Sequence, residues 1–253
     1  MIYAADRTPM PCPICGDDAF LCGVVDFHKS CIEAEGRFLP KMGIPVYYRQ
    51  CVRCRFLFCD TFKDWTREDF AAHIYNGDYG LVDPDYELVR PNGNAEMLVK
   101  AIGPKLAELR LIDFGGGNGR FAAALREQGF DAESFDPLAE TATPSAPADI
   151  VTAFEVVEHS NQQHQTLHQM LALLKPDGLL LFSTYVQPQG FNPLSAQGLN
   201  WWYVAPRNGH ISIHSRDSLT TLLASQGLSL HSLNHYMHIA FRTLPDFAKH
   251  LIA

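Results

Sequence analysis

Four cysteines near the N-terminus have the spacing of a metal site. Cys12-Pro-Ile-Cys15 and Cys51-Val-Arg-Cys54 form two C-x-x-C pairs, with 35 residues between them. Each pair bends into a tight turn that aims two thiolates at one point, and two such turns complete the tetrahedral shell of a structural zinc ion. We therefore expect Cys12, Cys15, Cys51 and Cys54 to bind zinc.

The segment around these cysteines, residues 1–62, predicts a small zinc ribbon. Its strand-like stretches read FLCGVVDF and IPVYYRQC, and they lie between the two cysteine pairs. A segment of this length, with few large apolar side chains, buries little surface of its own. We therefore expect the metal to contribute much of the ribbon's stability.

A glycine-rich loop forms the second group of residues that could do chemistry. In LIDFGGGNGRF, residues 111–121, an apolar strand runs into a glycine cluster and then into the first turn of a helix. Glycines at Gly115, Gly117 and Gly119 allow positive φ and a close approach of the backbone to a ligand, while the helix offers free N–H groups. The pattern predicts a cofactor loop.

Two cofactor classes fit this loop. Gly117-x-Gly119-x-x-Ala122 agrees loosely with the G-x-G-x-x-A pattern of dinucleotide folds, with Asp136 as the acid that binds the ribose. The other interpretation is the D-x-G-G-G-x-G loop of S-adenosylmethionine (SAM) enzymes, which begins here at Asp113. In that interpretation the Asp113 carboxylate meets the ammonium group of the cofactor's methionine part.

Two later motifs favour the SAM interpretation. PADIVTAFEVVEHS, residues 147–160, predicts a buried strand that ends in polar residues, and LLKPDGLLLFST, residues 173–184, predicts a turn and another buried strand. Together the three motifs resemble the class I SAM-dependent methyltransferases. The resemblance covers residues 95–235 and is to the branch with an E-V-L-E-H signature, seen here as Glu155-Val156-Val157-Glu158-His159.

The alternation of helices and strands predicts an α/β fold for residues 95–253, a Rossmann-like, doubly wound and mostly parallel sheet. It includes a strand at 228–237, and residues 235–253 are expected to form a last strand and a short helix. The segment between the ribbon and this domain, residues 63–94, is expected to be a linker or lid. The resemblance implies that SAM lies across the carboxyl ends of the first strands. The cofactor-binding residues expected from it are Asp113, Gly115, Gly117, Gly119, Asp136, Phe154, Glu155 and, from the lid, Tyr79.

One segment departs from the family pattern. Residues 137–148 are rich in Ala, Pro and Thr, and they are too few for the usual helix and third strand. In similar enzymes a residue after that third strand holds the adenine amino group. We therefore expect adenine to be held by backbone groups and by side chains near Phe154.

Three histidines are candidates for catalysis. His159 follows the fourth strand of the domain, where an imidazole could act as a base on an acceptor hydroxyl. WWYVAPRNGHISIHS, residues 201–215, contains His210 and His214, whose alternation would place both side chains on one face of an extended segment. A structural role, as hydrogen-bonded or packed side chains, is the alternative for all three.

Composition narrows the function further. The formal net charge is −8, and residues 1–62 hold seven basic and seven acidic side chains, which disfavours nucleic acid as a partner. No stretch resembles a signal peptide or membrane span, so we expect a cytoplasmic protein without a membrane partner.

The leading hypothesis is a methyltransferase acting on a small molecule. The ribbon followed by this core also resembles the first two parts of zinc-containing sugar C-methyltransferases, which implies a sugar as acceptor. Arg207 could bind a phosphate or carboxylate of the acceptor, so another anionic metabolite is also expected. Two alternatives remain open: an RNA methyltransferase that docks through the ribbon, and a zinc-stabilised binding protein with a vestigial SAM site.

Overall fold

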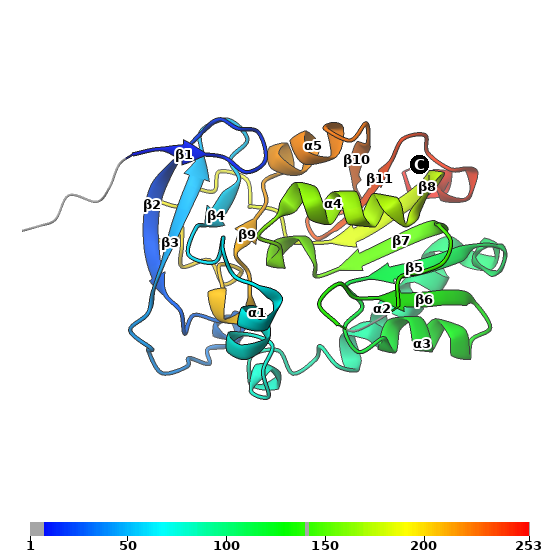
Figure 1. Ribbon diagram of the computed structural model, residues 1–253, viewed down its shortest axis with the longest axis horizontal. Coiled ribbons are helices and arrows are strands. Elements are labelled where there is room, and N and C mark those ends of the chain that lie inside the picture. The colour runs from blue at the N-terminus through cyan, green and yellow to red at the C-terminus, as the bar shows by residue number, and fades with distance from the viewer. Residues whose placement is uncertain (1–7, 140–141, 253) are drawn as a thin grey trace, which may run out of the picture. The chain divides into compact units, whose positions relative to one another are not determined.

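The strands of the computed structural model, which describes residues 8–139 and 142–252, form two separate sheets (Figure 1). The strands are β1 (Met10–Pro11), β2 (Asp18–Asp26), β3 (Pro45–Cys51), β4 (Leu57–Cys59), β5 (Arg110–Phe114), β6 (Asp131–Phe135), β7 (Ala148–Phe154), β8 (Leu174–Ser183), β9 (Ser212–Ile213), β10 (Ser229–Ser232) and β11 (Met237–Phe241). The α-helices are α1 (Arg67–His73), α2 (Val89–Ile102), α3 (Arg120–Glu127), α4 (Gln163–Ala172) and α5 (Arg216–Ala224). Short 3-10 helices are η1 (Cys31–Glu35), η2 (Tyr79–Leu81), η3 (Gly103–Glu108), η4 (Val157–His159), η5 (Pro206–Asn208) and η6 (Asp246–Leu251).

The chain divides into two compact units. The first contains Met1–Asp83, Glu158–His164 and Tyr185–Leu222, and the second contains Pro84–Val157, Gln165–Thr184 and Leu223–Ala253. The first unit thus takes in two segments far from the N-terminus in addition to the ribbon. The domain boundaries at residues 62 and 94 stay a prediction.

An antiparallel sheet in the order β1-β2-β3-β4-β9 forms the first unit. Its last strand comes from the histidine-bearing segment, because Leu57 and Phe58 of β4 pair with Ile213 and Ser212 of β9. Apolar side chains from both parts of the chain share one core, which includes Phe62, Tyr203 and Ile213. The ribbon therefore completes its hydrophobic core with residues that lie more than a hundred positions away.

The second unit holds a six-stranded mixed sheet in the order β10-β11-β8-β7-β5-β6. The pairs β5–β6, β5–β7 and β7–β8 are parallel, and the pairs β8–β11 and β10–β11 are antiparallel. From β5 the chain crosses by α3 to β6, and from β7 it crosses by α4 to β8, in the opposite direction along the sheet. Right-handed crossovers of this kind place the two helices on opposite faces, and the reversal between β5 and β7 is the switch point of a doubly wound fold.

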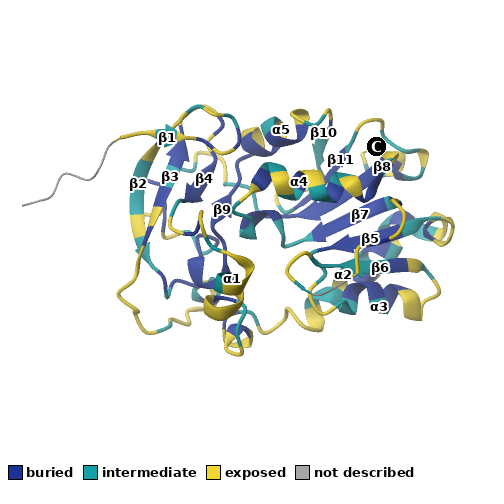
Figure 2. Ribbon diagram, in the orientation of Figure 1, coloured by how far each residue is buried: buried dark blue, intermediate teal, exposed yellow. Residues whose placement is uncertain are grey.

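The central strands are buried because their sequences are apolar on both faces. β7 reads ADIVTAF and the second half of β8 reads LLLFS, and Figure 2 shows both strands as buried. Strands covered by helices on both sides have this kind of continuous apolar sequence. The predicted Rossmann-like, doubly wound and mostly parallel α/β sheet is confirmed.

The sheet departs from the usual doubly wound pattern at one edge. β6 is its last strand, and the described part of residues 137–147 contains no helix or strand. The short segment was predicted to lack the third strand. Residues 140 and 141 lie outside the described part of the chain.

At the other edge, the bounds predicted for the strand at 228–237 are wrong, because β10 ends at Ser232. The last strand and short helix expected in residues 235–253 are confirmed as β11 and η6. The chain forms a hairpin there, with β10 and β11 on either side of a turn. The Asn234 side chain accepts hydrogen bonds from the N–H groups of Tyr236 and Met237, at 2.8 Å each. Asparagine side chains bond in this way to the backbone two residues on, and the local bonds end a strand.

No helix among the described residues is long and apolar enough to cross a membrane.

Candidate functional site

The glycine loop follows β5 at the switch point of the second unit, and two of its glycines leave no room for a side chain. A Cβ on Gly115, whose φ is +72°, would lie 2.6 Å from Val156 Cγ2. A Cβ on Gly116 would lie 2.2 Å from Ser134 Oγ and 2.5 Å from Asp113 Oδ2. The backbone therefore approaches the neighbouring strand ends more closely than any other residue type allows.

Of the two remaining glycines of the loop, Gly117 faces open space and Gly119 lies against Ser134. Gly117 has a φ of +54°, and a Cβ placed on it would meet no atom within 4 Å. Gly119 has a φ of +75° and is the N-cap of α3. The loop thus exposes its backbone at Gly117 and turns it into a helix at Gly119, as the sequence predicted for a cofactor loop.

Asp113 lies beneath this loop and is almost completely buried. Asp113 is 4% exposed, and its Oδ1 accepts a hydrogen bond of 2.7 Å from the Thr152 hydroxyl. Burial raises the pKa of Asp113 to about 7, the Thr152 hydrogen bond acts against this rise, and the charge of Asp136 adds to it. A cationic group near Asp113 would favour its charged form.

Asp136, after β6, presents a carboxylate in a fixed orientation. Its Oδ2 accepts the N–H of Gly117 at 2.9 Å, and its Oδ1 accepts the N–H of Leu138 at 2.7 Å. A carboxylate oxygen can accept more than one hydrogen bond. The same region holds Ser134 Oγ, a buried atom with no hydrogen-bond partner among the described residues.

The end of β7 carries the next two predicted residues. Glu155 has a φ of +55°, which is rare for a residue with a side chain, and its N–H donates to Ser183 Oγ at 2.9 Å. Phe154 packs edge-on against Phe121 of α3, with ring centroids 5.2 Å apart. Strained backbone of this kind is concentrated at ligand sites.

These features fit the methionine and ribose ends of a SAM molecule. The loop backbone, the fixed Asp136 carboxylate and the unsatisfied Ser134 hydroxyl all lie at the carboxyl ends of β5 and β6, where doubly wound folds bind nucleotide cofactors. Contacts of the predicted residues with a cofactor remain a prediction.

In the first unit, the four predicted cysteines come together. Cys12 Sγ lies 3.6 Å from Cys54 Sγ, Cys15 Sγ lies 3.4 Å from Cys51 Sγ, and all four sulfur atoms lie within 4.8 Å of one another. Four sulfur atoms bound to one zinc ion at about 2.3 Å would be about 3.8 Å apart. The cluster is therefore compatible with a structural zinc site.

The two cysteine turns have matching backbones. Gly16 follows the first turn with a φ of +77°, and Arg55 follows the second with a φ of +61°. The hydrogen bond between Cys12 and Cys54 lowers the pKa of the first thiol and raises the pKa of the second, so the two sulfur atoms share one proton. Thiolates, and not thiols, bind metal ions.

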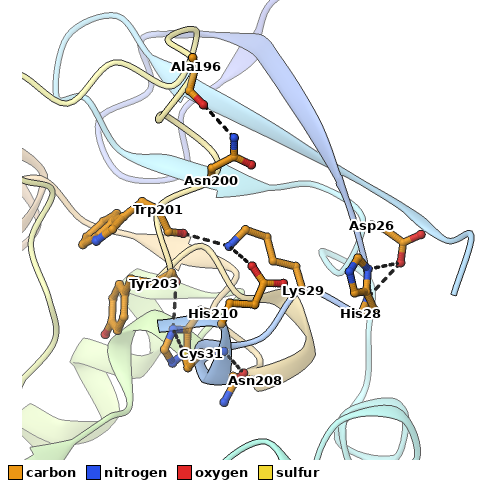
Figure 3. A network of polar contacts seen from close by, with 11 residues as sticks. Asp26, His28, Lys29, Cys31, Ala196, Asn200, Trp201, Tyr203, Asn208 and His210 are labelled. Carbon is orange, nitrogen blue, oxygen red and sulfur yellow. Dashed lines mark hydrogen bonds and ion pairs between the residues drawn. The ribbon is translucent and has the colours of Figure 1, made fainter. Parts of the chain in front are cut away.

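Two of the three candidate histidines lie together in the first unit. The ring centroids of His159 and His210 are 5.0 Å apart, and His210 Nδ1 lies 3.0 Å from the main-chain oxygen of Tyr203 (Figure 3). The carboxylate of Glu158 joins them, and the Tyr203 hydroxyl donates a hydrogen bond to it. The sequence did not single out Glu158 or Tyr203 as functional.

His214 lies apart from this group. It is fully buried, with Nδ1 3.2 Å from Ser218 Oγ and Nε2 3.2 Å from Gln163 Oε1. The extended segment that would have placed His210 and His214 side by side is limited to Ser212–Ile213. Both ring nitrogens of His214 thus have partners inside the first unit, which favours a structural role.

Tyr79, expected to contact the cofactor, is also buried in the first unit. Its hydroxyl lies 3.4 Å from the main-chain oxygen of Asn208, and its ring packs on Tyr75 with centroids 5.1 Å apart. Its contact with a cofactor stays a prediction.

Comparison with known families decides the classification. Residues 87–233, more than half of the chain, match a family model described as a methyltransferase domain. The chain belongs to this methyltransferase domain family. The matched range begins just before α2 and ends after β10, so it covers the glycine loop, Asp136 and the Glu155–His159 motif.

Individual relatives agree with this classification. A protein named ubiquinone biosynthesis O-methyltransferase, from Rickettsia typhi, is 27% identical over 132 residues, which are 42% of this chain and 53% of that protein. The chain is thus aligned with about half the length of this curated relative. The crystal structure of TnmH is similar in fold, with a TM-score of 0.50 and 16% identity, over 70% of this chain and 61% of that one.

An O-methyltransferase family protein from Burkholderia thailandensis has a TM-score of 0.48 and 17% identity over 72% of this chain and 64% of that chain.

Several residues at the two sites were missed by sequence reasoning. They are Gly116, Ser134, Thr152 and Ser183 around the loop, and Glu158 and Tyr203 beside the histidines. Gly116 was detectable as the middle glycine of GGG. Glu158 was detectable as the second glutamate of the Glu155–His159 motif. The others carry no local signal, because their roles depend on strands and turns that are brought together only by folding.

Proposed function

We propose that this protein transfers a methyl group from SAM to an oxygen atom of a small-molecule acceptor. One observation carries the proposal: the close-packed glycines Gly115 and Gly116 and the fixed Asp136 carboxylate lie together at the switch point of a methyltransferase-family fold. The relative named as an O-methyltransferase supports oxygen as the methylated atom.

Several residues of the second unit would bind SAM, each at a different part of the molecule. Asp136 is oriented to accept the two ribose hydroxyls, and Gly117 leaves its backbone open to a ligand. The Asp113 carboxylate would attract the ammonium group of the methionine part, either by direct contact or across the glycine loop. Phe154 and Glu155 border the place expected for the adenosine. When bound, SAM supplies an electrophilic methyl group that an acceptor oxygen can take by in-line displacement.

We propose a sugar or another anionic metabolite as the methyl acceptor. Arg207 is 8% exposed, and its Nη1 donates to the main-chain oxygen of Ile74 at 3.1 Å, so at least one of its donors serves the fold of the first unit. The net charge of −8 continues to disfavour RNA. A cytoplasmic location stays a prediction.

Among the candidate catalytic residues, we favour His159 and His210 over His214. The first two converge with a carboxylate, whereas both nitrogens of His214 hydrogen-bond to Ser218 and Gln163. Groups that converge on one point can act together on a ligand, and a histidine that only links two elements cannot.

We also propose that Cys12, Cys15, Cys51 and Cys54 bind one structural zinc ion. The spacing of the four sulfur atoms supports this assignment. A closed shell of four thiolates leaves no position for a substrate, so the ion would stabilise the ribbon without taking part in catalysis.

Isothermal titration calorimetry with SAM and S-adenosylhomocysteine tests the cofactor assignment. Wild-type protein should bind both, and Asp136→Asn should bind at least tenfold more weakly, because a neutral amide replaces the charged acceptor. Asp177→Asn, an exposed residue near the start of β8, is the matched control and should bind like wild type. Absence of binding by the wild type would refute the proposal. Binding without turnover over a broad panel of hydroxylated acceptors would favour the vestigial-site alternative.

A further inference from the structure

Three ligand-type side chains converge in the first unit, apart from the cysteine cluster. One oxygen of Glu158 and one ring nitrogen each of His159 and His210 lie within 4.8 Å of one another. Glu158 and His210 are buried, at 0% and 4% exposed, and His159 is half-buried. We define these three residues as the Glu-His-His cluster.

Tyr203 orients the carboxylate of this cluster. Its hydroxyl oxygen accepts the N–H of Tyr185 at 3.1 Å, and the hydroxyl proton is directed to Glu158 Oε1. A carboxyl oxygen can accept this bond in either protonation state, and only the ionised form is a good metal ligand. Burial of that negative charge is costly, and a bound cation would offset the cost.

The same tyrosine fixes the tautomer of His210. The Tyr203 main-chain oxygen, 3.0 Å from His210 Nδ1, can only accept a hydrogen bond (Figure 3). Cys31 Sγ, 3.6 Å from the same nitrogen, can also accept a hydrogen bond. A proton on Nδ1 suits both neighbours, and in the neutral ring Nε2 then carries the lone pair. Metal-binding histidines commonly donate their second N–H to a main-chain carbonyl in this way.

Gly209 makes room for His159. Its φ is +87°, and a Cβ on it would lie 2.8 Å from His159 Nδ1 and 3.0 Å from the Tyr75 hydroxyl. Any side chain at this position would displace the imidazole or the phenol. The backbone at Gly209 thus packs directly against one member of the cluster and lies next to His210 in the chain.

We propose that the Glu-His-His cluster binds one divalent first-row transition-metal ion, for which Zn²⁺ is the test ion. Two imidazoles and one carboxylate suit Zn²⁺ and its neighbours, whereas Mg²⁺ and Ca²⁺ prefer oxygen ligands throughout. In the metal-bound form, His159 and His210 serve as ligands and not as bases. This assignment replaces the role of base considered above for the two histidines. It rests on residues of the first unit only, and its tests measure metal content and not methyl transfer.

Metal content gives the first test. Wild type, Glu158→Gln, the double variant His159→Asn/His210→Asn and the control His168→Asn are loaded with Zn²⁺, passed over a chelating resin and measured by mass spectrometry for zinc per chain. His168 is an exposed histidine of α4, so the control makes the same chemical change outside the cluster. The double variant should hold one equivalent less than wild type, and the control should equal wild type. Equal zinc content in the double variant and wild type would overturn the proposal.

Cobalt separates this site from the cysteine cluster. Loaded with Co²⁺, wild type minus the double variant should give weak ligand-field bands without a thiolate-to-cobalt charge-transfer band. A charge-transfer band in that difference spectrum would assign the lost ion to cysteines and overturn the proposal. Displacement of the ion by millimolar Mg²⁺ would refute the transition-metal assignment.

Should the double variant not fold, the wild type alone decides the question. Titration with Co²⁺ should then show an equivalent taken up without the charge-transfer band, and uptake of thiolate-bound cobalt only would count against the site.

Discussion

The hydroxyl of Tyr203 donates a hydrogen bond to the buried carboxylate of Glu158. Tyr203 is itself buried, at 1% exposed, within the core that the ribbon shares with residues 199–213. The bond therefore joins the packing of the first unit to the orientation of the proposed metal ligands. Its removal should affect both.

Tyr203→Phe is expected to weaken zinc binding at the Glu-His-His cluster by roughly 10- to 100-fold, the usual effect of losing a group that orients a ligand. The free energy of unfolding should fall by about 1–3 kcal/mol, because a buried acceptor loses its donor. Zinc titration and urea unfolding measure the two effects. Tyr47→Phe removes the hydroxyl of an exposed tyrosine and should leave both values unchanged. Unaltered zinc affinity in Tyr203→Phe would show that the bond serves the fold alone.

Asp113 should make stability depend on pH. Its pKa is 3.8 in the unfolded chain and about 7 in the folded protein, so the folded state keeps a proton that the unfolded state releases. The group's contribution to stability is complete below about pH 4 and is lost as the pH rises toward 7, with a slope of at most about 1.4 kcal/mol per pH unit. Asp113→Asn removes this loss.

Urea unfolding of wild type and Asp113→Asn between pH 4.5 and 7.5 tests the sign. The stability of the variant relative to wild type should increase steadily with pH over this range. A constant difference between the two proteins would mean that Asp113 is ionised throughout.

Gly116→Ala should damage the cofactor site without a large change elsewhere. The new methyl group would meet Ser134 Oγ at 2.2 Å and Asp113 Oδ2 at 2.5 Å, so the loop or both side chains must shift. We expect SAM binding to weaken at least tenfold in calorimetry. Gly93→Ala, in the interior of α2 with no atom within 4 Å, should bind SAM normally and gain about 0.5–1 kcal/mol of stability. Normal SAM binding by Gly116→Ala would contradict the assigned loop geometry.

Cys51→Ser should remove one zinc equivalent per chain. Three remaining thiolates bind the ion less tightly, and the melting temperature should fall by roughly 10 °C or more, as expected for the loss of several kcal/mol in a chain of this size. Cys22→Ser is the control, since the Cys22 thiol lies outside the cluster and donates to the Tyr48 main-chain oxygen at 3.1 Å, a bond that serine can also make. Equal zinc content in Cys51→Ser and wild type would exclude the four-cysteine site.

Residues whose function depends on short spacings were predictable from the sequence. Two C-x-x-C pairs already specify four converging thiolates, and GGGNG after an apolar strand already specifies a loop with left-handed backbone. The apolar runs of β7 and β8 likewise predicted buried parallel strands. In each case neighbours in the chain supply the needed geometry, so no distant contact has to be known.

Tertiary structure alone decided what surrounds these motifs. The ribbon alone was expected to bury too little surface, yet its core includes Tyr203 and Ile213, because β9 pairs with β4. The alternation in the sequence would place His210 and His214 on one face of a strand. The extended segment between them is too short for this, and His210 lies with Glu158 and His159 instead. Such groupings depend on which distant segments pack together, and that choice follows from burial summed over the whole core and not from any local pattern.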